Sequence, residues 1–99
     1  MDNFEYMIDI ELPELTKEFI ELIPGQVAMT NRLMKKGKLT SYTLAQDRTK
    51  LWVTLNAASE EEVVEILKSF PIYSYLNYKI YKLAFNNYVS ITLPKVSLN

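Results

Sequence analysis

The order in which the hydrophobic periodicity changes along the chain constrains the fold more than any other feature. The first segment, residues 4–12, alternates between apolar and polar side chains. Its apolar positions are Phe4, Tyr6, Ile8, Ile10 and Leu12. A period of two is typical of a strand with one face in a core. Pro13 follows directly, so we expect the strand to end there.

The period then changes to that of a helix over residues 14–36. Apolar side chains recur at intervals of three and four, at Leu15, Phe19, Leu22, Ile23, Val27, Leu33 and Met34. Pro24 and Gly25 interrupt this stripe. Because proline lacks a backbone donor and clashes with the preceding turn, we expect a kink or two short helices. Gly37 lies where a left-handed C-cap would be needed.

A hairpin and a second helix are predicted next. Residues 39–45 and 51–56 have strand patterns, and the polar residues 46–49 form the turn between them. Ser59 and Glu62 have the spacing of a capping box, which marks the start of a helix. The apolar face of this helix comprises Val63, Val64, Ile66, Leu67 and Phe70.

Pro71 ends the second helix, and residues 78–85 predict a last strand. The order strand, helix, strand, strand, helix, strand is that of the ferredoxin-like α+β fold with an antiparallel sheet. We expect one domain over residues 1–99, with a core at about 4–86 and a C-terminal arm at about 87–99. Residues 88–93 favour a strand, which could add to a neighbouring subunit's sheet or extend locally on its own subunit.

Composition excludes several chemistries. The 99 residues include no histidine and no cysteine, so we expect no His or Cys metal site, no thiol nucleophile and no imidazole base. Eleven Lys and Arg face twelve Asp and Glu, a balance that argues against nucleic-acid binding. No apolar run approaches the roughly 20 residues of a membrane span, and no signal peptide is evident. We expect a cytoplasmic protein with no cofactor and no membrane partner.

Two groups of residues could carry chemistry. Asp9 and Glu11 share one strand face about 7 Å apart, which could suit acid and base roles. The alternatives are that these carboxylates point to water, or that they form ion pairs with Lys50, Lys79 or Lys82 across a dimer. Tyr and Phe are concentrated at Phe70, Tyr73, Tyr75, Tyr78, Tyr81, Phe85 and Tyr88. Such a group can form a pocket wall or a subunit interface.

Three stretches are less generic: residues 32–39 (RLMKKGKL), the Ala58-Ser59 pair, and above all residues 67–76 (LKSFPIYSYL). They resemble the muconolactone delta-isomerase family, over about residues 4–86. The resemblance implies a dimeric α+β barrel in which two ferredoxin-like sheets pack face to face. It also implies larger assemblies and a C-terminal segment that reaches over a neighbour.

The resemblance further implies a cofactor-independent isomerase of a small lactone or a related aromatic-catabolism intermediate, acting by proton transfer. Arg32 would hold the substrate anion, or it would only cap the helix and pair on the surface. Asp9 or Glu11 would move the proton, and the pocket would be lined by Tyr42, Trp52, Tyr73 and Tyr75. The family's Trp-Arg pair on the second strand is replaced here by Thr43 and Leu44. The alternative is therefore a non-catalytic dimeric module that binds a small ligand or serves in assembly.

Overall fold

A computed structural model describes residues 3–87 of the chain. The elements follow in the order β1 (Phe4–Glu11), α1 (Lys17–Lys35), β2 (Leu39–Leu44), β3 (Lys50–Ala57), α2 (Glu60–Lys68), the 3₁₀ turn η1 (Tyr73–Tyr75) and β4 (Asn77–Lys82). The predicted α+β order is confirmed. The proposed arm at residues 88–93 lies outside the described residues. No helix within residues 3–87 has the length and apolarity that crossing a membrane requires.

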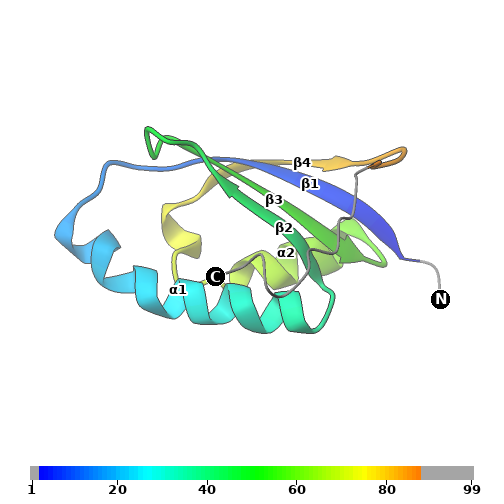
Figure 1. Ribbon diagram of the computed structural model, residues 1–99, viewed down its shortest axis with the longest axis horizontal. Helices are drawn as coiled ribbons and strands as arrows, with labels where there is room; N and C mark the ends of the chain where they lie inside the picture. The colour runs from blue at the N-terminus through cyan, green and yellow to red at the C-terminus, as the bar shows by residue number, and fades with distance from the viewer. Residues whose placement is uncertain (1–2, 88–99) are drawn as a thin grey trace, which may run out of the picture.

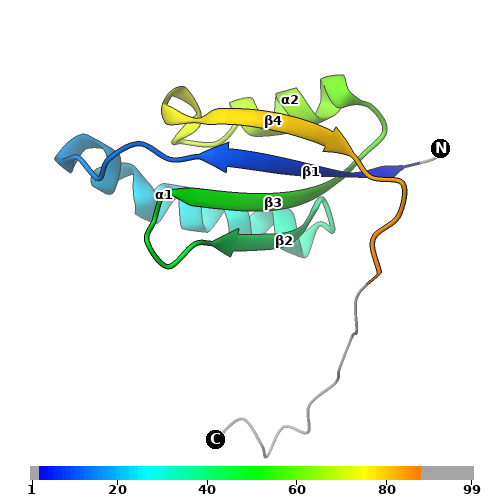
Figure 2. The same cartoon turned by 90° about the horizontal axis from the view of Figure 1, so that it is seen from above.

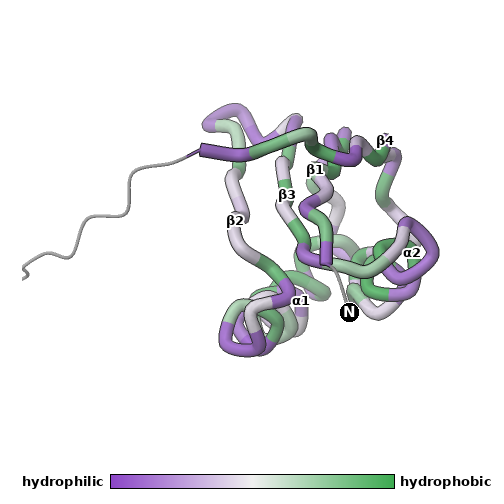
Figure 3. The backbone as a smooth tube through the Cα atoms, turned by 90° about the vertical axis from the view of Figure 1, so that its right-hand side faces the viewer, coloured by the Kyte–Doolittle hydropathy of each residue, from purple (hydrophilic) through white to green (hydrophobic). Residues whose placement is uncertain are grey.

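The four strands form one antiparallel sheet in the order β2-β3-β1-β4 (Figure 2). Strands β1 and β3 occupy its centre and pair along their whole length. Both helices lie on the same face of this sheet, as Figures 1 and 3 show from two directions. We call this the inner face. The opposite, outer face carries no helix within residues 3–87.

The core lies between the inner face and the helices. On β1 the apolar positions Tyr6, Ile8 and Ile10 are at most 4% exposed, as their alternation predicts. From β3, Leu51, Val53 and Leu55 lie beside them, and α2 contributes Val63 and Leu67. Burial of a Leu or Ile side chain contributes about 1.5–3 kcal/mol, so this layer is the main source of stability.

Helix α1 differs from its prediction at its start and in its middle. It begins at Lys17, because the Thr16 hydroxyl accepts a hydrogen bond from the Phe19 N–H (3.2 Å) and caps the first turn. It then runs unbroken through Pro24 to Lys35, so the alternative of two short helices is wrong. The missing proline donor removes one intrahelical bond, and packing of the helix on the sheet offsets that loss.

The buried side of α1 also differs from the predicted stripe. Leu15, Val27 and Met34 are about half exposed, at 51%, 50% and 45%. Gln26 and Thr30 are buried instead, at 2% and 5%. The helix is therefore rotated so that two polar side chains face the sheet, and the sequence pattern placed the buried side too near Val27.

Several boundaries shift by one to three residues. Strand β2 ends at Leu44, where the prediction continued to Ala45, and β3 begins at Lys50 and ends at Ala57. Strand β4 ends at Lys82, whereas the prediction extended to Phe85. Beyond Lys82 the chain passes the end of β1, where the Leu83 N–H still donates to the Glu5 carbonyl. Main-chain hydrogen bonding to β1 thus continues for one bond beyond the end of β4.

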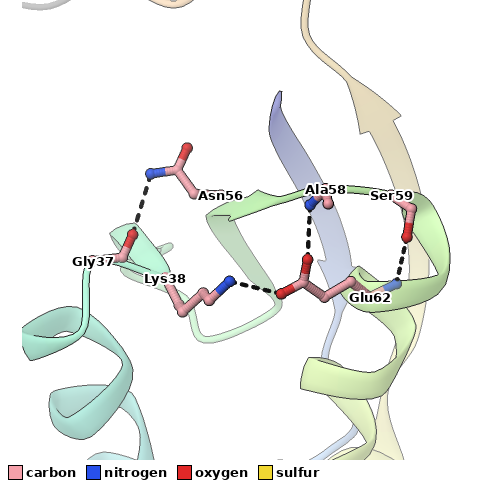
Figure 4. A network of polar contacts seen from close by, with 6 residues as sticks. All are labelled: Gly37, Lys38, Asn56, Ala58, Ser59 and Glu62. Atoms are coloured by element: carbon pink, nitrogen blue, oxygen red, sulfur yellow. Dashed lines mark hydrogen bonds and ion pairs between the residues drawn. The ribbon is translucent and has the colours of Figure 1, made fainter. Parts of the chain in front are cut away.

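One polar network joins the turn between α1 and β2 to the end of β3 and the start of α2 (Figure 4). The Glu62 N–H donates to the Ser59 hydroxyl (3.2 Å), as the capping box predicts. The Glu62 carboxylate, however, accepts from the Ala58 N–H (2.7 Å), one residue earlier than in the standard motif. Gly37 has φ +73°, which confirms the left-handed C-cap, and its carbonyl accepts from the Asn56 amide (3.2 Å).

Candidate functional site

The larger pocket lies between α1 and the inner face of the sheet at its β2 edge, and we call it the α1 pocket. Its volume is about 260 Å³. The lining residues are Leu12, Leu15, Phe19, Ile23, Gln26, Val27, Tyr42, Leu44, Arg48, Leu51 and Ile72. Most of these side chains are apolar, and among residues 3–87 the lining includes no carboxylate.

The inner wall of the α1 pocket carries one polar group of three side chains. Gln26 and Thr30 are one turn apart on α1, and the Gln26 Nε2 donates to the Thr30 Oγ1 (3.3 Å). Tyr42 reaches them from β2. Burial raises the pKa of the Tyr42 phenol, and a hydrogen bond with Thr30 partly offsets that effect. Tyr42 is thus held in its neutral form, as a hydrogen-bonding group and not as a base.

Within residues 3–87, the outer rim is apolar except for one cation. Leu15, Ile23, Val27 and Leu44 are all more than a third exposed there. Arg48 lies in the turn between β2 and β3 with φ +66°, and its N–H donates to the Ala45 carbonyl (3.0 Å). A guanidinium at the mouth suits an anionic or polar substituent that stays close to solvent.

A second, smaller pocket of about 130 Å³ lies at the end of β1 where that strand meets β3 and β4. Asp9, Glu11, Lys50 and Lys79 converge there, and we call them the outer cluster. The Lys50 ammonium lies 2.5 Å from the Asp9 Oδ1. This hydrogen bond raises the pKa of Lys50. The sequence predicted such pairing across a dimer. This is corrected for Asp9, which pairs with Lys50 of the same chain.

The two sites lie on opposite faces of the sheet. Asp9 pairs in register with Trp52, and Ile10 pairs with Leu51. Because side chains alternate along a strand, Asp9 points to the outer face while Leu51 points into the α1 pocket. A small molecule in one site therefore cannot touch the other.

One comparison decides the family. The family model described as muconolactone delta-isomerase matches residues 3–87, which include every helix and strand described above. The chain belongs to the muconolactone delta-isomerase family. No curated protein matches it.

Among the residues that the sequence placed in an isomerase-type pocket, only Tyr42 lines the α1 pocket. Trp52 lies on the outer face, beside Asp9. Arg32 lies on the exposed side of α1, with its Nη2 3.9 Å from the Met29 sulfur. Arg32 lines neither pocket described here.

Neither tyrosine of η1 lines the α1 pocket. The Tyr75 ring packs edge-on against Phe19, with 5.2 Å between ring centres, and so supports the pocket wall. The Tyr73 hydroxyl lies 3.5 Å from that of Tyr78. The seven predicted candidates therefore do not form one site, and the two carboxylates are separated from Tyr42 by the sheet.

The departures of this isomerase-family chain on β2 also fall on different faces. Leu44 lines the α1 pocket and adds an apolar side chain to it. Thr43 pairs with Trp52 on the outer face.

Sequence reasoning missed Gln26 and Thr30. The signal was present, since both fall at helical spacing from Phe19 and Leu33, on the stripe that faces the sheet. Two polar side chains four residues apart within an apolar stripe indicate either an internal hydrogen bond or a polar spot in a pocket. In this protein Gln26 and Thr30 form an internal hydrogen bond and also a polar spot in the α1 pocket.

Proposed function

We propose that the protein binds a small organic molecule with a single ring in the α1 pocket, as a ligand-binding member of the muconolactone delta-isomerase family. The observation that carries this proposal is the lining itself. It is mainly apolar, it has one polar group on its inner wall, and among the described residues it offers no carboxylate to act as a base. Such a lining suits recognition better than proton transfer.

The size of the pocket sets the ligand class. A closed apolar cavity of about 150 Å³ holds benzene, and pockets for drug-sized ligands begin at about 300 Å³. The α1 pocket, at about 260 Å³, lies between these limits. A single ring with one or two small substituents is the ligand that fits.

Binding can be tested with a matched pair of variants on α1. Val27 lines the pocket and is 50% exposed, whereas Ile20 is 48% exposed and does not line it. Val27→Trp should obstruct the mouth and weaken binding of phenol at least tenfold in an NMR titration. Ile20→Trp makes the same kind of change outside the pocket and should leave the affinity unchanged. Equal affinities for both variants and the wild type would show that phenol does not bind in the α1 pocket.

A second candidate is the isomerase activity itself, which family membership favours. Moving a proton next to a carbonyl needs a base and a group that stabilises the developing negative charge. The outer cluster could supply them as the Asp9 carboxylate and the Lys50 ammonium, which lie 2.5 Å apart. It would act at the outer face, away from Tyr42.

The ultraviolet absorbance of muconolactone distinguishes the two candidates. For a binding protein we expect no change above background with the folded wild type. Turnover that Asp9→Asn abolishes and Lys79→Gln retains would instead support catalysis at the outer cluster. Lys79 is the control because it belongs to the same cluster. It lies opposite Asp9 on the neighbouring strand, but the ion pair of Asp9 is with Lys50.

We also propose that a second copy of the chain covers the outer face. This face combines charged side chains with the large side chains of Met7, Trp52 and Tyr81, which lie on neighbouring strands. Tyr81 is 50% exposed, and Trp52 is partly exposed. Aromatic side chains with a polar surround are typical of subunit interfaces. A homodimer would bury them without affecting the α1 pocket.

A further inference from the structure

The inner wall of the α1 pocket contains an unused hydrogen-bond acceptor. The Gln26 side chain is 2% exposed, and its Nε2 donates to Thr30. Its Oε1 is also buried, yet it has no hydrogen-bond partner among the described residues. An amide oxygen without a partner in such surroundings destabilises a fold by about 1–3 kcal/mol.

Several side chains around Gln26 are apolar and buried, so none of these can pair with its oxygen. Phe19, Leu51 and Ile72 line the pocket beside it and are each at most 3% exposed. A methionine at position 26 would fill similar space without an unpaired oxygen. The unpaired Gln26 oxygen would therefore be satisfied if a ligand in the pocket donated a hydrogen bond to it.

From this geometry we infer that the α1 pocket selects a ring bearing an O–H or N–H donor, which the Gln26 Oε1 accepts. The inference rests on the proposed function, since it specifies the ligand class of the same pocket. The terminal torsion of glutamine is broad, so the amide can turn to present this oxygen to a ligand in the pocket. The same oxygen repels a carboxylate at the inner wall. An anionic substituent is accordingly accommodated only at the mouth, near Arg48.

Phenol and fluorobenzene test this selectivity, because they have similar shapes and only phenol has a donor. Their dissociation constants are measured by NMR titration for the wild type and for Gln26→Met. We expect the ratio of the two constants to favour phenol about tenfold more in the wild type than in the variant, the effect of one buried hydrogen bond of about 1.4 kcal/mol. Gln26→Met should fold, since it removes an unpaired polar atom.

A measurement on the wild type alone provides a second test. Addition of phenol should shift the Gln26 side-chain amide resonances, and addition of fluorobenzene should shift them much less. If both ligands bind but the ratio is the same in the wild type and the variant, the pocket stands and the selectivity inference is overturned. If neither ligand binds, the proposed function fails and this inference fails with it. The selectivity inference would also be overturned if the ratio of dissociation constants favoured fluorobenzene more in the wild type than in Gln26→Met.

Discussion

The Lys38 ammonium lies 2.7 Å from the Glu62 Oε2, and this ion pair joins the residue before β2 to the first turn of α2. The other carboxylate oxygen of Glu62 accepts from the Ala58 N–H (2.7 Å). One side chain thus connects the helix-to-strand junction of the first half to the strand-to-helix junction of the second. Lys38 and Glu62 are 24 residues apart in the chain.

Glu62→Gln should lower the free energy of unfolding at pH 7 by about 1 kcal/mol. It removes the charge from a capping interaction, and such caps contribute about 0.5–2 kcal/mol. Glu61→Gln is the matched control, since Glu61 has the same charge in the same first turn. It should cost less than about 0.5 kcal/mol. Urea denaturation of both variants checks this, and equal losses would contradict a specific role for Glu62.

The contribution of Glu62 should also depend on pH. The hydrogen bond from Ala58, and then the one from Lys38, lower the pKa of the Glu62 carboxyl below its ordinary value. A lowered pKa in the folded state gives stability that is present above the unfolded value, about 4.3, and is lost as the pH falls through the folded value. The difference between the wild type and Glu62→Gln should therefore shrink between pH 5 and pH 3. A difference that stays constant over that range would refute the assignment.

The two glycines should respond to alanine in opposite directions. Gly37 has φ +73°, so Gly37→Ala should destabilise the protein by about 1–2 kcal/mol. Gly25 lies within α1, where a Cβ would be 3.6 Å from the Pro71 Cγ, an ordinary contact. Gly25→Ala should stabilise by up to about 1 kcal/mol because alanine favours a helix. Thermal unfolding of both variants compares them, and a stabilised Gly37→Ala would be inconsistent with the left-handed cap.

A charge on the outer face should disrupt the proposed dimer. Trp52→Glu is expected to weaken self-association at least 30-fold, because a central aromatic at an interface contributes about 2 kcal/mol or more. Val27→Glu introduces the same charge at an exposed apolar site on α1 and should leave the dimer intact. Sedimentation equilibrium gives the dissociation constants. A monomeric wild type at micromolar concentration would contradict the proposal.

The fold was largely predictable from local patterns. Alternation on β1 identified its buried face correctly, and Ser59, Glu62 and Gly37 marked helix ends through geometry that only a few residue types satisfy. Pro24 led to the prediction of a kink or two short helices, and the two-helix alternative is wrong. Proline weakens a helix locally, but whether the helix breaks depends on what it packs against, and α1 packs on the sheet, chiefly at β2.

The candidate site was much less predictable. Tyr42, Trp52, Tyr73 and Tyr75 were grouped in one pocket, and the structure separates them, because residue type alone does not assign a side chain to a face or a wall. Gln26 was overlooked because the apolar stripe was centred too near Val27. A rotation of the helix by a fraction of a turn exchanges its buried and exposed positions, and sequence spacing defines that rotation only coarsely.

The sequence by itself determined the order of the elements, the caps and the family, because these depend on neighbouring residues and on short motifs. It also excluded imidazole and thiol chemistry, since neither side chain occurs in the chain. Only the tertiary structure decided which side chains share a site. It separated Asp9 and Glu11 from Tyr42 by the thickness of a sheet, and it brought Gln26 of α1 to Tyr42 of β2. Such contacts join distant segments, so they depend on strand register and helix rotation, which no local pattern specifies.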